Sequence, residues 1–489
     1  MAWRRNPWLA ALVLATAALV PVGIPALSRF RLMGVKDLHQ TVVDPFLSHP
    51  RIPLVAMRPR TEALKLEPPI PSHPVEATIP GGDSKPPLRA LPVPKLAPGD
   101  EALLSDPQNA LKGFHEALAR VERGDGLARV LHLGDSVVTG DLITGEARTR
   151  LQKAFGDGGP GWIYLQRPWE WYGRPGLTLK GEGWRIQSPI LTARRDHLYG
   201  LGDIAFASEN GAETQLSTGK SQPFSTLEIH YLAQPKGGRI RVKVDKATDL
   251  EMGTTGELGP AVKSLPMPSD QPHSLSLRPS GDTLIYGLVL ERKGPGVVYD
   301  AIGSNGGAIQ HLAKIEALNW IQALRLRRPD LVILAFGTNE VGYYNIPGPA
   351  YAADYREVVR RLREALPAAS ILVMGPMDRG ERTEQGEIGT MPNLVRIVEA
   401  QRKIAAELGV AFFDTFRAMG GEGAAGRWYL ATPRLMTGDF THPTRTGADR
   451  LARLLVEALQ GRYQAYRDSA NPQQHPAPAE TGAKGSQRR

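Results

Sequence analysis

The chain of 489 residues contains no cysteine, which excludes disulfide bonds, zinc–thiolate sites and a cysteine nucleophile. It also lacks internal repeats and any basic block with interleaved aromatic residues. The formal net charge of +9 comes from scattered Lys and Arg side chains. It indicates either a generally basic solvated surface, which we favour, or attraction to an acidic partner such as a polyanionic envelope. We expect no nucleic-acid partner.

The N-terminal segment predicts export from the cytoplasm. Arg4 and Arg5 precede an uncharged apolar stretch of about twenty residues, a length that suits a transmembrane anchor or a long signal peptide. Pro21 and Pro25 interrupt the candidate cleavage sites, which favours an uncleaved signal anchor over residues 1–30. In either case the rest of the chain is expected outside the cytoplasm, because positive charges stay on the inner side.

Two further segments are predicted to lie outside the folded part. Residues 51–100 hold 12 of the 41 prolines, and proline disrupts both helices and sheet ladders, so residues 31–100 are expected to form a Pro-rich linker. Residues 468–489 are polar and are expected to form a disordered tail.

The remaining chain alternates short apolar runs with amphipathic helical patterns. Five apolar runs read as strands: ARVLHLG, VVYDAIG, LVILAFG, ILVMG and VAFFD. Each is followed by a helical segment, and the order predicts an α/β fold with a parallel sheet between two helical layers. Ligands of such sheets bind beyond the carboxyl ends of the strands.

This alternation is interrupted between the first and second strands. The pattern there becomes β-like, and residues 165–296 are predicted to form an inserted all-β domain, with a jelly roll as the favoured topology. Within it, residues 225–245 read as a hairpin that turns at residues 235–238. The α/β domain is therefore expected to comprise residues 101–164 and 297–467.

Residues with catalytic potential stand at three strand ends, namely Ser136, the Gly306-Gly307 pair and Asn339, and before the last helix, namely Asp439 and His442. A serine hydroxyl becomes a nucleophile when a base takes its proton. His442 is the candidate base, and Asp439 the group that would hold its tautomer. Purely structural roles remain open for three of these residues: Asp439 as a helix cap, Asn339 as a turn residue and Gly306 as the residue that leads into a helix.

Acyl transfer also needs donors for the oxyanion. The backbone N–H groups of Ser136 and Gly306 and the side-chain amide of Asn339 are the candidates. Gly307 is the alternative to Gly306, because the doubled glycine leaves the register open by one residue. Half of the eight tryptophans fall within a short stretch, and they serve either packing or sugar stacking: Trp162, Trp169, Trp171 and Trp184.

These ordered blocks resemble the SGNH (GDSL-like) hydrolase superfamily. The resemblance covers roughly residues 126–164 and 297–462 and implies a flavodoxin-like five-stranded parallel sheet. It implies Ser136, Asp439 and His442 as the catalytic triad, Ser136, Gly306 and Asn339 as the oxyanion donors, and no metal or organic cofactor. Val137 departs from the name motif, and Glu340 stands where the family usually has aspartate, a position that is usually structural.

One subgroup is more similar than the rest. The block GTNE, the run LQKAFGDGGPGW and the β insertion look like bacterial peptidoglycan O-acetylesterases. The implied function is an extracytoplasmic serine esterase that removes O-acetyl groups from an envelope polysaccharide, with peptidoglycan favoured. Two alternatives remain: an O-acetyltransferase with the same triad, and a glycan-binding scaffold with a vestigial hydrolase core. A lipase is disfavoured, because no apolar lid segment is visible.

Overall fold

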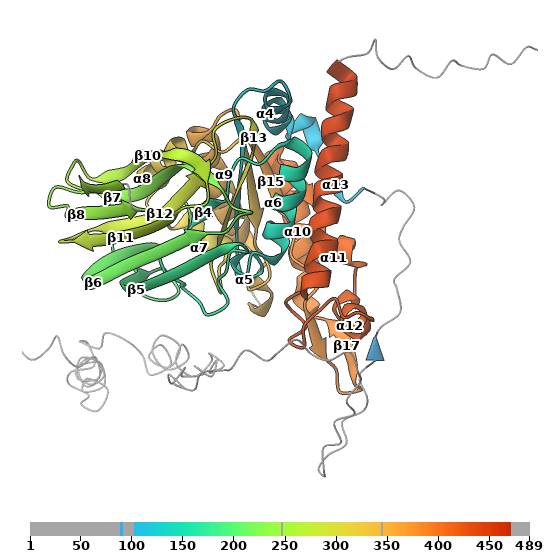
Figure 1. Ribbon diagram of the computed structural model, residues 1–489. Helices are drawn as coiled ribbons and strands as arrows, with labels where there is room; N and C mark the ends of the chain where they lie inside the picture. Colours follow the sequence, from blue (N-terminus) through green and yellow to red (C-terminus); the bar gives the residue numbers. More distant parts are fainter. Residues whose placement is uncertain (1–88, 91–101, 246–247, 344–345, 471–489) are drawn as a thin grey trace, which may run out of the picture. The chain divides into compact units, whose positions relative to one another are not determined.

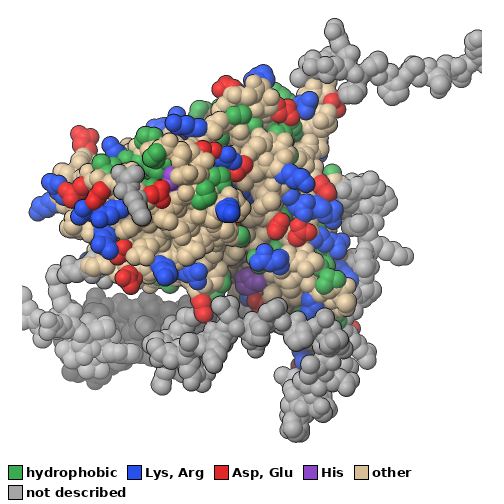
Figure 2. Space-filling view, viewed as in Figure 1, with side chains coloured by type: hydrophobic (Ala, Val, Ile, Leu, Met, Phe, Trp, Pro, Cys, Tyr) green, Lys and Arg blue, Asp and Glu red, His purple; other side chains and the backbone are tan. Residues whose placement is uncertain are grey.

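A computed structural model describes residues 89–90, 102–245, 248–343 and 346–470. The predicted signal anchor and nearly all of the predicted linker and tail lie outside these residues. Within the described part, no helix combines the length and the apolarity that crossing a bilayer requires. On the face drawn in Figure 2, Lys and Arg side chains are interspersed with Asp and Glu, as a generally solvated surface would have them.

A parallel sheet lies at the centre of the α/β part (Figure 1). Its strands are β3 (Leu127–Gly134), β13 (Gly296–Gly303), β14 (Leu331–Ala335), β15 (Ser370–Met374) and β18 (Ala411–Phe413). They pair in parallel in the order β13-β3-β14-β15-β18. Numbered along the chain this is 2-1-3-4-5, the flavodoxin-like order, as predicted. A two-residue strand that the sequence did not indicate, β2 (Leu104–Ser105), adds an antiparallel edge beside β18.

Helices cover both faces of this sheet because its strands are apolar on both sides. In β14, Leu331 and Ile333 pack into one buried cluster, whereas Val332 and Leu334 pack into another. The first cluster includes side chains from α4 (Lys112–Glu122), α6 (Leu142–Phe155), α11 (Thr415–Met419), α12 (Ala424–Leu430) and α13 (Arg445–Ala470). The second includes side chains from α7 (Ile309–Ala313), α8 (Ala317–Arg327), α9 (Pro349–Ala365) and α10 (Pro392–Leu408).

Antiparallel strands fill the interval between β3 and β13, as expected. They are β4 (Gly161–Ile163), β5 (Leu177–Gln187), β6 (Ala205–Thr218), β7 (Phe224–Ala233), β8 (Arg239–Val244), β9 (Thr248–Gly253), β10 (Gly259–Gln271), β11 (Ser274–Ser280) and β12 (Leu284–Glu291). All nine belong to one hydrogen-bonded sheet. Its buried side chains share a cluster with α8 and α9. Its description as a separate jelly-roll domain over residues 165–296 stays a prediction.

The predicted hairpin over residues 225–245 is wrong. A tight turn does form, with the Gly237 amide donating to the Gln234 carbonyl at 2.9 Å. The strands on its two sides then separate: β7 pairs with β10 and β12, whereas β8 pairs with β9 and β11. The turn residues were read correctly, but long-range pairing decided the partners of the two strands.

A small third sheet is formed by two strands that follow β15 in the chain, together with β1. It comprises β1 (Arg89–Ala90), β16 (Gly380–Arg382) and β17 (Glu387–Thr390), in the order β1-β17-β16. β1 falls inside the region that the sequence assigned to the linker, and it pairs in parallel with β17.

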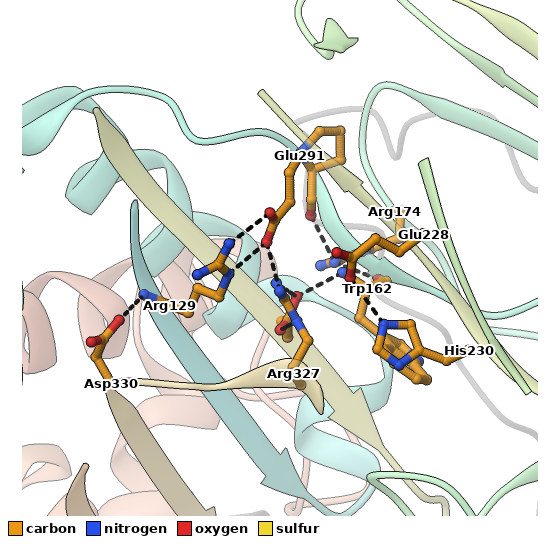
Figure 3. Close-up of polar contacts among 10 residues, drawn as sticks. Arg129, Trp162, Arg174, Glu228, His230, Glu291, Arg327 and Asp330 are labelled. Atoms are coloured by element: carbon orange, nitrogen blue, oxygen red, sulfur yellow. Dashed lines mark hydrogen bonds and ion pairs between the residues drawn. The ribbon is translucent and has the colours of Figure 1, made fainter. Parts of the chain in front are cut away.

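A buried ionic network joins the antiparallel strands to the parallel sheet (Figure 3). Arg327 of α8 binds Asp300 of β13 at 2.6 Å and Glu291 of β12 at 2.6 Å, and its side chain is 1% exposed. Arg129 of β3 adds two bonds to Glu291, at 2.8 and 2.9 Å. Asp300 also accepts from the Trp162 amide of β4 at 2.9 Å.

The charges in this network are mutually compensated. Burial by itself would raise the pKa of Glu291, but the guanidinium groups of Arg327 and Arg129 outweigh it and lower the pKa to about 2. Each charged group is held by at least one opposite charge, which is the condition under which buried ions are tolerated.

Arg327→Met should therefore destabilise the fold by about 3–5 kcal/mol, because it leaves Asp300 and Glu291 buried without their shared cation. Urea unfolding measures the difference. Arg325→Met, on the exposed face of the same helix, is the matched control and should change the free energy of unfolding little. Equal effects of the two substitutions would contradict this account of the network.

Candidate active site

Ser136 occupies a tightly built turn at the carboxyl end of β3. It is the first residue of the short helix α5 (Ser136–Thr139), and the Asp135 carboxylate caps that helix by accepting from the Val137 amide at 3.0 Å. A β-carbon on Gly134 would lie 2.5 Å from a methyl group of Val138 and 2.7 Å from the Ala335 carbonyl oxygen. Glycine is required there because the turn packs directly on α5 and β14.

The structure brings the three predicted triad residues together. His442 Nε2 lies 2.9 Å from Ser136 Oγ, across 306 positions of sequence, and His442 Nδ1 lies 2.6 Å from Asp439 Oδ2. The loop before α13 fixes this geometry. Asp439 Oδ1 accepts from the backbone amides of Thr441 and His442, at 2.9 and 3.0 Å, and from the Thr437 hydroxyl at 2.6 Å.

These contacts set the charges of the pair. Partial burial acts to raise the pKa of Asp439, but the hydrogen bonds from His442, Thr437 and the loop amides outweigh it, so the pKa lies well below its usual range. The hydrogen bond to Asp439 and the negative charge of that carboxylate raise the pKa of His442. An ionised Asp439 therefore directs the Nδ1 proton of His442 toward itself and leaves Nε2 to accept from Ser136.

The glycine loop after β13 gives the two candidate glycines different surroundings. The Gly307 amide donates to the Ser304 carbonyl at 2.8 Å, and a β-carbon on Gly307 would lie 2.7 Å from that oxygen. The Gly306 amide has no hydrogen-bond partner among the described residues, and Gly306 has a φ of 77°, which favours glycine. Gly306 is therefore the better placed of the two to donate to a ligand.

Asn339 lies beside this loop. Its side-chain nitrogen donates to the Gly307 carbonyl at 2.8 Å, which leaves the second hydrogen of the amide for a ligand. Ser136 is at the first helical position of α5, where a backbone N–H has no partner within the helix. The three candidate oxyanion donors thus come from the ends of three adjacent strands: β3, β13 and β14.

Glu340 connects two of these loops. Its buried carboxylate accepts from the Gly337 amide at 3.0 Å and from the Ile309 amide at 3.2 Å, so it ties the loop after β14 to the start of α7. Burial raises its pKa to about 7. These contacts are those of a structural residue, the role that the resemblance implies for this position.

A cleft of about 470 Å³ opens beside the triad. It is lined by Ser136, Val137, Gly140, Leu142, Trp171, Thr437, Asp439, His442 and Pro443. Ile190, from the segment between β5 and β6, lies close to Gly306. A β-carbon on Gly306 would be 3.8 Å from two side-chain carbons of Ile190. Sequence analysis missed Ile190, because no motif marks an apolar residue that lies more than a hundred positions from Gly306.

Comparison with known proteins shows what parts of this chain are similar to. Residues 280–450 match the model of the GDSL-like lipase/acylhydrolase family. A solved structure of a peptidoglycan O-acetylesterase is 25% identical, covers 74% of this chain and 100% of its own, and superimposes with a TM-score of 0.64. No curated protein sequence matches the chain significantly.

Two other solved structures cover less of this chain, at lower sequence identity. An acetyl xylan esterase is 20% identical over 33% of this chain and 81% of its own, with a TM-score of 0.26. A family two carbohydrate esterase from Cellvibrio japonicus is 12% identical over 59% of this chain and 98% of its own, with a TM-score of 0.24.

The protein has a hydrolase domain of the GDSL-like (SGNH) type, as the sequence blocks predicted. The match to this family covers residues 280–450, and the five residues singled out from the sequence lie together at the carboxyl edge of the parallel sheet.

For the wild-type enzyme, kcat/KM should rise with pH through an apparent pKa above the ordinary value of 6.5, because the neutral form of His442 is the base and Asp439 favours the protonated form. Asp439→Asn should shift this limb to lower pH and reduce kcat by about 10⁴-fold. The pH–rate profiles of an acetyl ester test this. Asp245→Asn, which breaks an Asp–His pair in the antiparallel sheet, is the matched control and should leave the profile unchanged.

Asn339→Ala should lower kcat by about 10²–10³-fold with a smaller change in KM, because it removes a donor that acts mainly on the developing oxyanion. Asn339→Asp keeps the shape without the donor and should lose as much. Steady-state kinetics measure both effects, and thermal unfolding checks that the loop still folds. A change in kcat below about threefold would remove Asn339 from the oxyanion site.

Proposed function

We propose that this protein is a serine O-acetylesterase that removes acetyl groups from an envelope polysaccharide, with peptidoglycan as the favoured substrate. The observation that carries the proposal is the hydrogen-bonded chain from Ser136 Oγ through His442 to Asp439, at 2.9 and 2.6 Å. The substrate class is supported by the likeness to a peptidoglycan O-acetylesterase over 74% of the chain.

In the first half of the reaction, Ser136 Oγ attacks the acetyl carbonyl carbon while His442 Nε2 takes the hydroxyl proton. The oxyanion accepts hydrogen bonds from the Ser136 and Gly306 amides and the Asn339 side chain. The intermediate collapses with cleavage of the bond between the carbonyl carbon and the sugar oxygen. His442 gives its proton to that oxygen, and the acetyl group remains on Ser136.

In the second half, a water molecule attacks the acetyl-serine while His442 Nε2 takes one of its protons. The second tetrahedral intermediate releases acetate, and the proton returns to Ser136 Oγ. Every bond change is completed by water and the triad, so the proposed reaction calls for no metal or organic cofactor.

We also propose that the enzyme acts outside the cytoplasm, membrane-anchored or secreted, since an apolar segment follows two arginines at its N-terminus. The inserted all-β domain over residues 165–296 belongs to the same proposal. It is supported by the run of antiparallel strands between β4 and β12.

Acetate release from O-acetylated peptidoglycan by the full chain tests the function. Wild-type enzyme should release acetate and Ser136→Ala should not. If no acetate is released and the acetyl groups are found on hydroxyl groups of an added de-acetylated glycan, the protein is instead an acetyltransferase. A wild-type protein that cleaves neither this polymer nor a simple acetyl ester would contradict the esterase and favour a vestigial scaffold.

A further inference from the structure

Trp171 is exposed, in contrast to the other three tryptophans of this stretch of sequence. Trp162 and Trp184 are buried, and Trp169 is partly buried against the main apolar cluster, so the packing interpretation holds for these three. Trp171 is 52% exposed and lines the cleft together with Ser136 and His442. Single exposed apolar side chains are common at protein surfaces, so it is the place of Trp171 in the lining of this cleft that distinguishes it.

The segment that carries Trp171 is firmly anchored on both sides of it. The Tyr172 amide donates to the Trp169 carbonyl at 3.0 Å, and the buried Tyr172 hydroxyl accepts from the Tyr164 amide at 3.0 Å. Trp171 is therefore presented on a fixed turn, so little backbone freedom is lost when a ligand contacts it.

Arg174 links this turn to the nucleophile region. Its buried guanidinium binds Asp141 at 3.1 Å and the carbonyl groups of Pro160 and Trp162 at 3.0 and 2.7 Å, and Figure 3 shows it beside Trp162. Asp141 also pairs with Arg148 and stands just before α6, five positions after Ser136. One buried ionic cluster thus ties the segment just after Trp171 to the residue that precedes α6.

The position of His442 indicates whether the acyl half or the alcohol half of an ester enters this cleft. His442 Nε2 must give its proton to the departing oxygen, so the alcohol half of the ester lies on the side of His442. The cleft is lined by His442 and Pro443 together with Trp171, whereas the oxyanion candidates Gly306 and Asn339 do not line it. Its volume of about 470 Å³ is within the usual range of small-ligand sites.

We propose that Trp171 forms the subsite for the sugar ring that carries the acetyl group, with the indole face against the C–H face of the ring and Val137, Leu142 and Pro443 completing the walls. The assignment rests on the proposed function. An aromatic face is electronegative and attracts the C–H groups of a pyranose, while the sugar hydroxyl groups remain directed to water. Trp171 is a positioning residue, because it contacts the leaving group away from the reacting atoms.

The test compares two acetyl esters that differ only in the alcohol: an O-acetylated N-acetylglucosamine and ethyl acetate. A nitrophenyl ester is unsuitable, because its own ring can stack on Trp171. Trp171→Ala should lower kcat/KM for the acetylated sugar by about 10- to 100-fold, the loss expected for one large apolar contact. With ethyl acetate the change should stay within about twofold. Trp171→Phe should recover most of the loss.

Leu318→Ala is the matched control, since Leu318 is also large, apolar and exposed but belongs to α8. Equal losses on both esters would overturn the subsite, because Trp171 would then support the triad itself. Full activity of Trp171→Ala on the acetylated sugar would overturn it as well. If the wild-type enzyme cleaves ethyl acetate but no acetylated sugar or glycan, the proposed function fails together with the subsite. Failure of the proposed function is therefore detected with the wild-type enzyme alone, before any variant is tested.

Discussion

The site depends on the register of the parallel strands, because β3, β13 and β14 all end at the same height along the sheet. Gly134 of β3 lies opposite Gly303 of β13 on one side and opposite Ala335 of β14 on the other. At Gly303 a β-carbon would lie 2.3 Å from the Thr139 backbone nitrogen of α5. Two glycines at one level therefore let the nucleophile helix sit directly on the strand ends. The three loops that start there carry Ser136, Gly306 and Asn339.

Buried carboxylates hold these loops in place. Asp135 caps α5, Glu340 ties the loop after β14 to α7, and Asp141 joins the nucleophile region to the turn of Trp171. Each accepts hydrogen bonds from backbone amides or arginine side chains, so the reactive groups are positioned before substrate arrives. Such preorganisation is the main source of transition-state stabilisation in esterases of this kind.

The antiparallel strands contribute to this arrangement. Arg327, Asp300 and Glu291 connect β12 to β13 and α8, and the Trp162 amide brings β4 into the same network. The segment that follows β4 carries Trp171 to the cleft, and the segment after β5 carries Ile190 to Gly306. The β-rich region thus adds side chains around the site, whereas Ser136, Gly306 and Asn339 follow strands of the parallel sheet and Asp439 and His442 precede α13.

The sequence was sufficient for the parts of the structure with local signals. Each parallel strand is a short apolar run followed by an amphipathic helix. Ser136 and Asn339 are marked by turn residues at strand ends, and the Asp439–His442 pair by its place before the last helix. Contacts between distant segments carried no such signal. The partners of β7 and β8, the place of Ile190 and the choice of Trp171 among four tryptophans depend on contacts between separate segments of the chain. The choice of Gly306 over Gly307 required the bond from Gly307 to Ser304.

The central claim is that Ser136 carries the acetyl group between the two halves of the reaction. The most direct measurement is peptide mapping by mass spectrometry after the full chain is mixed briefly with an activated acetyl ester and quenched in acid. The account predicts one acetyl group on the peptide that contains Ser136, absent at longer times and absent from Ser136→Ala. Acetate release without acetylation of Ser136, or acetylation of a different residue, would contradict it.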